Sequence, residues 1–211
     1  MPDPYVRTIA ADAHHEIEIK KSRFLCTLAR VATEADARAR LEQIRKQHWD
    51  ANHHCYAYVL GDRASTQKAS DDGEPAGTAG VPILEVLKRR EVTDTLAIVT
   101  RWFGGTKLGA GGLIRAYGQA VSETIDRVGI VERRPFDLVE VAVPYDDAGR
   151  IEHALRASPH PPVDITYAAE VRFLLHLDPA DLAPFRAWLG ELTSGAAHAE
   201  ITGRAFAEVP V

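Results

Sequence analysis

The first third of the chain shows the periods of strands and of one helix. Residues 16–20 alternate between polar and apolar, which is typical of a half-buried strand, and residues 23–31 form a second strand-like run. Thr33 and Asp36 then predict a helix start, because a threonine hydroxyl accepts a hydrogen bond from an unpaired backbone N–H. Residues 55–60 are aromatic and β-branched and predict another strand.

The middle of the chain combines a polar segment with three regular elements. Small and polar residues follow no period over 63–77, so we expect a mobile loop there. A helix is predicted to follow it, with Pro82 in the first turn, where the missing N–H of proline costs nothing. Residues 95–100 form a near-continuous apolar run, typical of a strand buried on both faces. Residues 112–128 predict a further helix with one apolar side.

The pattern changes after Arg133-Arg134-Pro135, which we take as the domain boundary. The predicted elements beyond it are a strand, a helix, two strands, a helix and a strand, over 136–143, 146–157, 163–168, 170–177, 179–192 and 199–207. This order is that of the ferredoxin-like, split βαβ arrangement. The sequence therefore predicts an α+β protein with two domains, 1–134 and 135–211.

Composition narrows the classes of function. The chain has 211 residues, of which 45% are hydrophobic and 26% charged, and its formal net charge is −5. This excludes a strongly basic nucleic-acid binder, so any contact with RNA must come from a local patch. Cys26 and Cys55 make no disulfide framework, which fits a reducing compartment. Since neither a signal-peptide pattern nor an apolar stretch of roughly 18 residues is present, we expect a cytoplasmic protein without a membrane partner.

An acidic cluster precedes the helix that contains Pro82. Asp71, Asp72 and Glu74 repel one another unless a cation, basic side chains or solvent offset their charge. One interpretation is a site for Mg²⁺ or for a basic partner. The other, which spacing alone favours, is an exposed acidic loop whose charges suit the positive end of the following helix.

A glycine-rich segment, with five glycines in the nine residues 104–112, joins the strand at 95–100 to the next helix. Glycines let backbone N–H groups approach an anion, and a helix N-terminus adds partial positive charge, so this segment predicts a phosphate cradle. The candidate binding residues are Arg101, Trp102, Gly104, Gly105, Lys107, Gly109, Gly111, Gly112 and Arg115. The segment matches neither the Walker pattern nor the dinucleotide fingerprint. Close packing of strand against helix is the alternative, and the sequence gives it equal weight.

His53, His54 and Cys55 invite a metal interpretation. Adjacent histidines on a strand point to opposite faces, and no second Cys/His pair lies at zinc spacing, so packing is favoured. A Cys/His nucleophile pair would need an orienting third residue, which nothing in the sequence places beside it. We assign no metal ligand, no cofactor and no catalytic residue.

These segments resemble the signatures of the YigZ/IMPACT family, also called UPF0029. Residues 70–82 and 101–117 look like its two main signatures, and residues 20–24 and 51–58 look like two weaker blocks. Trp102 stands where the family often has tyrosine. Beyond residue 134, the chain is similar to the bacterial members in length and element order only.

The resemblance implies a fold and a field of activity. The N-terminal domain is expected to have the ribosomal protein S-five domain-two-like fold, with helices on one sheet face, as in domain four of elongation factor G and in GHMP kinases. The C-terminal domain is expected to be ferredoxin-like and similar to the last domain of that factor. The eukaryotic relatives relieve translational control by competing for a kinase activator, through an added N-terminal module that has no counterpart in this sequence. The resemblance implies no catalytic residues.

Three functions are compatible with the sequence. We rank first a non-enzymatic protein that binds RNA, the ribosome or a translation factor, in which cations meet phosphates and aromatics stack on bases. An adaptor that docks proteins through the acidic loop ranks second, and an Mg²⁺-dependent phosphate-handling enzyme ranks third. No DNA partner is expected, and the sequence leaves the oligomeric state open. Charged groups of the acidic loop and the glycine-rich segment within about 10 Å of each other would favour one composite site.

Overall fold

The computed structural model describes residues 6–61 and 63–211, which form two compact units. The first unit comprises the residues up to Arg133 together with Glu208–Val211, and the second comprises Arg134–Ala207. The division therefore falls one residue before the expected boundary. The last four residues join the first unit, where the N–H of Val211 donates to the carbonyl of Ile130. Within the described ranges, no helix is long and apolar enough to cross a membrane.

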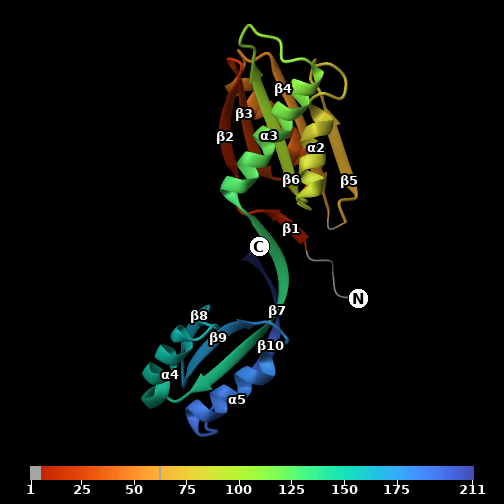
Figure 1. Cartoon of the computed structure of the whole chain (residues 1–211). Coiled ribbons are helices and arrows are strands. Elements are labelled where there is room, and N and C mark those ends of the chain that lie inside the picture. The colour runs from red at the N-terminus through yellow and green to blue at the C-terminus, as the bar shows by residue number, and fades with distance from the viewer. Residues whose placement is uncertain (1–5, 62) are drawn as a thin grey trace. The chain divides into compact units, whose positions relative to one another are not determined.

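A five-stranded antiparallel sheet frames the first unit (Figure 1). Its strands, in spatial order, are β2 (Ala13–Ile19), β3 (Ser22–Arg30), β6 (Thr95–Trp102), β4 (His53–Leu60) and β5 (Thr66–Ser70). The central strand β6 is buried from Thr95 to Arg101, as its apolar run predicts. This strand ends directly at the glycine-rich segment.

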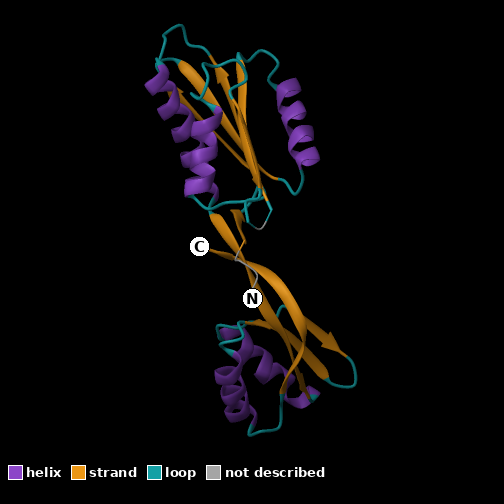
Figure 2. Cartoon of the chain, turned by 90° about the vertical axis from the view of Figure 1, so that its right-hand side faces the viewer, coloured by secondary structure: helices purple, strands orange, loops and turns teal. Residues whose placement is uncertain are grey.

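Helices cover both faces of this sheet (Figure 2). Helices α2 (Gly80–Arg89) and α3 (Ala110–Val128) pack on the face that includes Ala97 and Val99. Helix α1 (Glu34–Gln47) packs on the opposite face, which includes Leu96 and Ile98. The expectation of helices on one face is corrected here, because a strand that is apolar on both sides needs cover on both.

Two strands differ from the sequence-based expectations. The segment 63–77 contains β5, which pairs with β4 from Tyr56 to Leu60, so the expectation of a mobile loop throughout this segment is wrong. The strand escaped notice because it lies at the sheet edge and is mostly polar. Strand β1 (Val6–Ile9) was not predicted, and it pairs with the first residues of β7 (Ile130–Val143).

The second unit has the predicted ferredoxin-like arrangement. After β7 come α4 (Tyr145–Ala157), β8 (Asp164–Tyr167), β9 (Val171–Leu177), α5 (Leu182–Thr193) and β10 (Ala199–Pro210). The strand order is β10-β7-β9-β8, with antiparallel pairing of β7 with β9 and of β9 with β8. Both helices share one core with β7 and β9, around Ile151, Phe173 and Phe185. The α+β class is thereby confirmed.

Candidate functional site

The glycine-rich segment begins with a close contact between two backbones. A Cβ atom added at Gly104 would lie 2.0 Å from the carbonyl carbon of Lys21, in the turn between β2 and β3. The N–H of Gly104 donates to Oγ of the buried Ser22, at 3.1 Å. Gly104 therefore serves backbone packing, but against the turn between β2 and β3 and not, as the alternative interpretation expected, between strand and helix. Gly105 and Gly109 instead have positive φ angles, 84° and 74°, and a Cβ there would meet open space.

Beyond Gly104, the backbone amides are open. The N–H of Gly104 is taken by Ser22, and that of Leu113 donates to the carbonyl of Gly109. Between them, the N–H groups of residues 105–112 have no acceptor among the described residues. Most of this stretch is exposed, and it leads into α3, whose N-terminus carries partial positive charge. Such an array of free donors is suited to hold an anion.

Two exposed cations flank these amides. Lys107 lies within the segment itself. Arg115 reaches back over the first turn of α3, since its Nη1 atom would lie 3.8 Å from a Cβ at Gly111. Neither side chain forms an ion pair or hydrogen bond with any part of the chain that the structure describes. Both charges are therefore available to a ligand.

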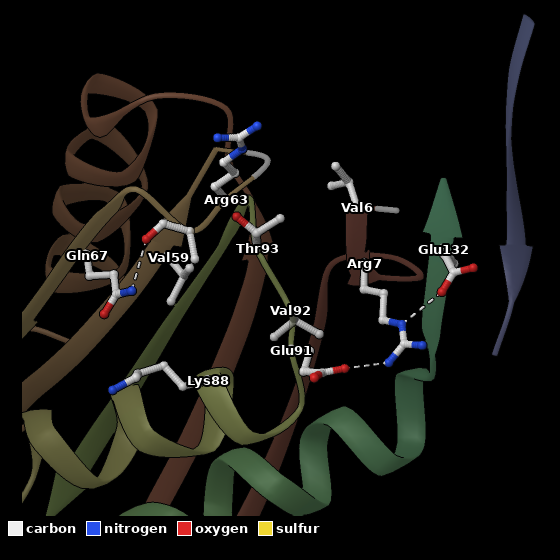
Figure 3. A pocket seen from close by; sticks show the side chains of 11 residues that line it. Val6, Arg7, Val59, Arg63, Gln67, Lys88, Glu91, Val92, Thr93 and Glu132 are labelled. Atoms are coloured by element: carbon white, nitrogen blue, oxygen red, sulfur yellow. Dashed lines mark hydrogen bonds and ion pairs between the residues drawn. The ribbon is translucent and has the colours of Figure 1, made fainter. Parts of the chain in front are cut away.

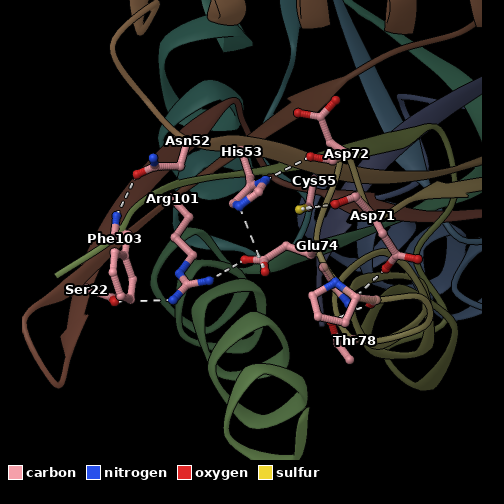
Figure 4. Close-up of polar contacts among 12 residues, drawn as sticks. Ser22, Asn52, His53, Cys55, Asp71, Asp72, Glu74, Thr78, Arg101 and Phe103 are labelled. Carbon is pink, nitrogen blue, oxygen red and sulfur yellow. Dashed lines mark hydrogen bonds and ion pairs between the residues drawn. The ribbon is translucent and has the colours of Figure 1, made fainter. Parts of the chain in front are cut away.

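Arg101 has a different environment from the one the sequence suggests. Its side chain is only 6% exposed, and its Nη1 donates to Oε1 of Glu74, which is 4% exposed, at 2.5 Å (Figure 4). The guanidinium carbon lies 5.3 Å and 5.7 Å from the ring centres of Phe24 and Phe103. Its buried Nε has no acceptor within the described ranges. Arg101 therefore neutralises Glu74 beneath the glycine-rich segment instead of presenting a charge to solvent.

The three carboxylates of the acidic loop have three different sets of partners. Asp71 accepts hydrogen bonds from the N–H groups of Gly77, Ala79 and Gly80 at 2.8, 3.0 and 2.9 Å, and thus caps α2. The spacing in the sequence favoured an exposed acidic loop whose charges suit the start of this helix. Asp71 does interact with the helix start, but its carboxylate is bound to backbone N–H groups and is not free. Neither a converging set of metal ligands nor a free acidic docking surface results.

The other two carboxylates are bound to side chains and backbone of neighbouring strands and helices. Asp72 pairs with Arg45 at 2.8 Å and accepts from the backbone N–H of His54 at 2.7 Å. Besides Arg101, Glu74 accepts from the hydroxyl of Tyr117 at 2.7 Å and lies 3.9 Å from Nε2 of His53. Their negative charges are therefore offset inside the first unit.

The acidic loop and the glycine-rich segment share one cavity of about 350 Å³. The loop contributes Glu74 and Pro75, and the segment contributes Lys107, Leu108, Gly109 and Ala110. Arg101 and Phe103, which precede the segment, and Leu113, which follows it, complete the lining. The walls are mainly apolar, the ion pair between Glu74 and Arg101 lies at one side, and Lys107 is the exposed cation. Glu74 and Arg101 are in contact at 2.5 Å, well within the distance of about 10 Å that favours one composite site.

Trp102 does not belong to this cavity. Successive residues of a strand point to opposite faces, so Trp102 lies on the face of α1 while Arg101 lies on the face of α3. The indole N–H donates to Asp50 at 2.9 Å. The ring of His48 packs against the indole in a T-shaped arrangement, with 5.5 Å between ring centres, and the guanidinium carbon of Arg23 lies over the indole, 4.6 Å from its centre. We therefore remove Trp102 from the set of candidate anion ligands.

The polar residues below the cavity support its shape. Sγ of Cys55 lies 3.0 Å from the carbonyl oxygen of Asp71 and 3.3 Å from the hydroxyl of Tyr117. Burial raises the pKa of the Cys55 thiol to about 12, so it is not a thiolate nucleophile at neutral pH. The described residues include no cluster of three or more His, Cys, Asp or Glu arranged to hold a metal ion.

Two supporting residues were missed by sequence reasoning. Ser22 accepts hydrogen bonds from Gly104 and from Nη2 of Arg101, and Oδ1 of Asn52 accepts from the N–H of Phe103 at 2.8 Å. Ser22 lies in the block 20–24 and Asn52 in the block 51–58. The resemblance of these two blocks to the family was the signal in the sequence that could have indicated both residues. Their hydroxyl and amide groups hold the end of β6 in place.

The Asp71 cap gives a testable pH dependence. Burial alone would raise the pKa of Asp71, but hydrogen bonds from three backbone N–H groups outweigh it and lower the pKa below its usual value. Its contribution to stability is therefore complete above the unfolded-state pKa, near 3.9, and is lost as pH falls through the lower folded-state value. Asp71→Ala is expected to lower the free energy of unfolding by about 1–2 kcal/mol at pH 7.

Urea denaturation at pH 7, 5 and 3 measures this effect. The difference between wild type and Asp71→Ala should be equal at pH 7 and 5 and smaller at pH 3. Glu85→Ala, an exposed carboxylate on the same helix, serves as the control and should change little at any pH. An undiminished difference for Asp71→Ala at pH 3 would show that the carboxylate charge does not matter.

A second cavity, of about 550 Å³, lies elsewhere in the first unit (Figure 3). Arg7 lies beside it and donates to both Glu91 and Glu132, at 2.7 and 2.9 Å, so these charges are largely mutually satisfied. Neither the acidic loop nor the glycine-rich segment contributes to its lining. It is not the site that the sequence motifs form.

Comparisons with known proteins agree with the motifs. The family described as Impact N-terminal domain matches residues 20–125, and the one described as Domain of unknown function (DUF1949) matches residues 141–196. The chain is 50% identical to the IMPACT family member YvyE of Bacillus subtilis over 188 residues, which cover 89% of this chain and 87% of that protein. It is 37% identical to the IMPACT family member YigZ of Escherichia coli, over 84% of this chain and 88% of that protein.

A solved structure is similar over nearly the whole chain. It is a crystal structure described as that of a hypothetical protein, 35% identical, with a TM-score of 0.60. The similarity covers 94% of this chain and 97% of the other. Both units thus have counterparts in one known protein.

Proposed function

This chain belongs to the IMPACT family, and from that premise we propose that it is a non-enzymatic binding protein that acts in translation or its regulation by contacting RNA. The contact is made by the amides of residues 105–112, with Lys107 and Arg115 beside them. Because the proposed role is in translation, we take ribosomal RNA as the RNA to be contacted. The translational part of this proposal rests on the resemblance to the eukaryotic relatives.

The array of free amides carries the proposal. The exposed donors of residues 105–112 have no acceptor in the described part of the chain, and they lie at the start of a 19-residue helix, beside two cations that are unpaired there. Phosphate oxygens satisfy such donors, and cations close by add charge-assisted contacts. The adjoining cavity, with Phe103, Leu108 and Leu113 in its walls, offers an apolar surface against which a base can pack.

The acidic loop does not oppose this function. A free acidic cluster beside the amides would repel RNA, but Glu74 is neutralised by Arg101 and Asp72 by Arg45. Because the same carboxylates are engaged internally, the geometry also gives less support to a protein adaptor or to an Mg²⁺-dependent enzyme. The buried, protonated thiol of Cys55 supplies no nucleophile.

Removing the two flanking cations should weaken RNA binding. We expect Lys107→Ala/Arg115→Ala to bind ribosomal RNA fragments at least about tenfold more weakly at low salt, because two phosphate contacts are lost. Fluorescence anisotropy with labelled RNA, repeated over a salt series, measures both the affinity and its salt dependence.

A matched control separates the site from general charge effects. Lys68→Ala/Arg127→Ala removes the same net charge from exposed positions, and Arg127 lies twelve residues, about 18 Å, along α3 from Arg115. This variant should bind like the wild type. Equal weakening in both double variants, or wild-type binding that is independent of salt, would contradict the proposal.

A further inference from the structure

The turn between β2 and β3 places two more cations at the glycine-rich segment. From their location, we infer that Lys20 and Lys21 form a second phosphate contact of the same surface, so that the ligand is a single strand of RNA that spans both contacts. The inference rests on the proposed function and goes beyond it by naming the form of the ligand. It concerns residues outside the segment 101–117.

The position of the turn is fixed by the close contact at Gly104. Ile19 and Ser22 are paired residues of β2 and β3, so Lys20 and Lys21 alone form a two-residue turn. The backbone of Lys21 touches that of Gly104, where a Cβ would come within 2.1 Å of the Lys21 carbonyl oxygen. Gly104 and Lys107 are three residues apart, at most about 11 Å along the chain. The two lysines of the turn therefore adjoin the open amides.

The residues in this turn are unusual for its geometry. Both have positive φ angles, 49° for Lys20 and 65° for Lys21, as in a type I′ turn. Such turns favour Asn-Gly, Asp-Gly or Gly-Gly, because a Cβ atom is disfavoured at positive φ. Lysine at both positions is a locally unfavourable choice. A role of the two lysine charges in binding a ligand explains why lysines occupy these unfavourable positions.

The charges of the turn are available to a ligand. Both lysines are exposed, and neither forms an ion pair or hydrogen bond with another described residue. Nearby Arg23, by contrast, is engaged by Glu16 at 2.8 Å. The surface thus contains four cations that have no partner among the residues the structure describes, namely Lys20, Lys21, Lys107 and Arg115.

An exposed aromatic ring and a buried arginine lie close to Gly104, where the turn meets the glycine-rich segment. Phe103 is 48% exposed and directly precedes Gly104, so its ring is accessible beside both contacts. Arg101, whose buried Nε has no acceptor among the described residues, lies 5.7 Å from that ring and lines the cavity. A cationic surface interrupted by an exposed aromatic ring matches the way single-stranded nucleic acids are bound, with phosphates on cations and a base on the ring. An isolated phosphate would use only one of the two contacts.

The test removes both turn charges while keeping the turn. Lys20→Asn/Lys21→Gly installs the residues that a type I′ turn prefers, so the variant should unfold at or above the wild-type temperature. Its affinity for a labelled single-stranded RNA of about ten nucleotides should fall about tenfold at low salt. The plot of log affinity against log salt should become shallower by about 1.4, because each of the two lysines neutralises one phosphate and each neutralised single-strand phosphate contributes about 0.7.

Four proteins are compared: wild type, Lys20→Asn/Lys21→Gly, Lys107→Ala/Arg115→Ala, and the control Lys68→Ala/Arg127→Ala. If the turn variant matches the wild type in affinity and salt slope while Lys107→Ala/Arg115→Ala is weakened, this inference is wrong and the proposed function stands. If the wild type does not bind the RNA at all, both are wrong. Tighter binding of a DNA strand of the same sequence than of the RNA would overturn the assignment to RNA.

Discussion

Gly104→Ala is expected to lower the free energy of unfolding of the first unit by about 3–5 kcal/mol. A Cβ atom there would lie 2.0 Å from the carbonyl carbon of Lys21 and 2.4 Å from the amide nitrogen of Ser22. Both are backbone atoms, which cannot rotate away as a side chain can. The two chains must therefore separate, which also breaks the hydrogen bond from Gly104 to Ser22.

Gly111→Ala is the matched control for this prediction. It lies in the same segment, where an added Cβ would meet only Nη1 of Arg115, at an ordinary 3.8 Å. Because Gly111 lies in the first turn of α3, alanine there should be neutral or stabilising by up to about 1 kcal/mol. Urea denaturation followed by tryptophan fluorescence in a Trp188→Phe background reports the first unit alone, since Trp49 and Trp102 both lie there. Equal stability of the two alanine variants would show that the backbones at Lys21 and Gly104 are not in close contact.

Breaking the ion pair between Glu74 and Arg101 should have an effect of similar size. Glu74→Gln leaves the guanidinium of Arg101 buried without its counter-charge, which is expected to cost about 3–5 kcal/mol. Arg101→Met removes the other charge and leaves the carboxylate of Glu74 buried, so it should also be strongly destabilising. The hydroxyl of Tyr117 still finds an acceptor in Glu74→Gln, so the loss is assigned to the charge.

A double-mutant cycle tests this coupling. In Glu74→Gln/Arg101→Met neither buried charge remains, so its loss of stability should be smaller than the sum of the two single losses. The free energies of unfolding come from the same urea denaturation assay. Arg45→Met, which removes an ion pair of a more exposed carboxylate, Asp72, should cost less than Arg101→Met. Additive losses in the cycle would mean that the two charges are not coupled.

The sequence pattern was sufficient to predict an element where the residues in contact lie close together in the chain. The helix start at Thr33 is confirmed, because Oγ of Thr33 accepts from the N–H of Asp36 only three residues later. The ferredoxin-like order of the second unit is also confirmed, since each strand and helix there shows its own period. The polar edge strand β5 was not predicted, because none of its side chains is buried and so it lacks an apolar period.

The candidate site was located by its motifs but not understood from them. The glycines, Lys107 and Arg115 do lie together at the start of α3, as their closeness in the sequence requires. Trp102 and Arg101, in contrast, are neighbours in sequence and lie on opposite faces of β6. Alternation along a strand separates the two side chains in principle, but only the fold shows that α3 covers one of these faces and α1 the other.

The sequence by itself determined most of the regular elements, though not β1 or β5, and it determined the α+β class, the family, and a glycine-rich segment before a helix. Tertiary structure alone decided which charges are used inside the protein and which remain for a ligand. Glu74 and Arg101 are 27 residues apart, and Lys21 and Gly104 are 83 apart, yet each pair is in contact. The physical reason is that the apolar period of a segment records only which of its own side chains are buried. Ion pairs and backbone contacts depend instead on which distant segments the sheet brings side by side. The fold thereby pairs Asp72 and Glu74 with arginines and brings the Lys20-Lys21 turn to the open amides.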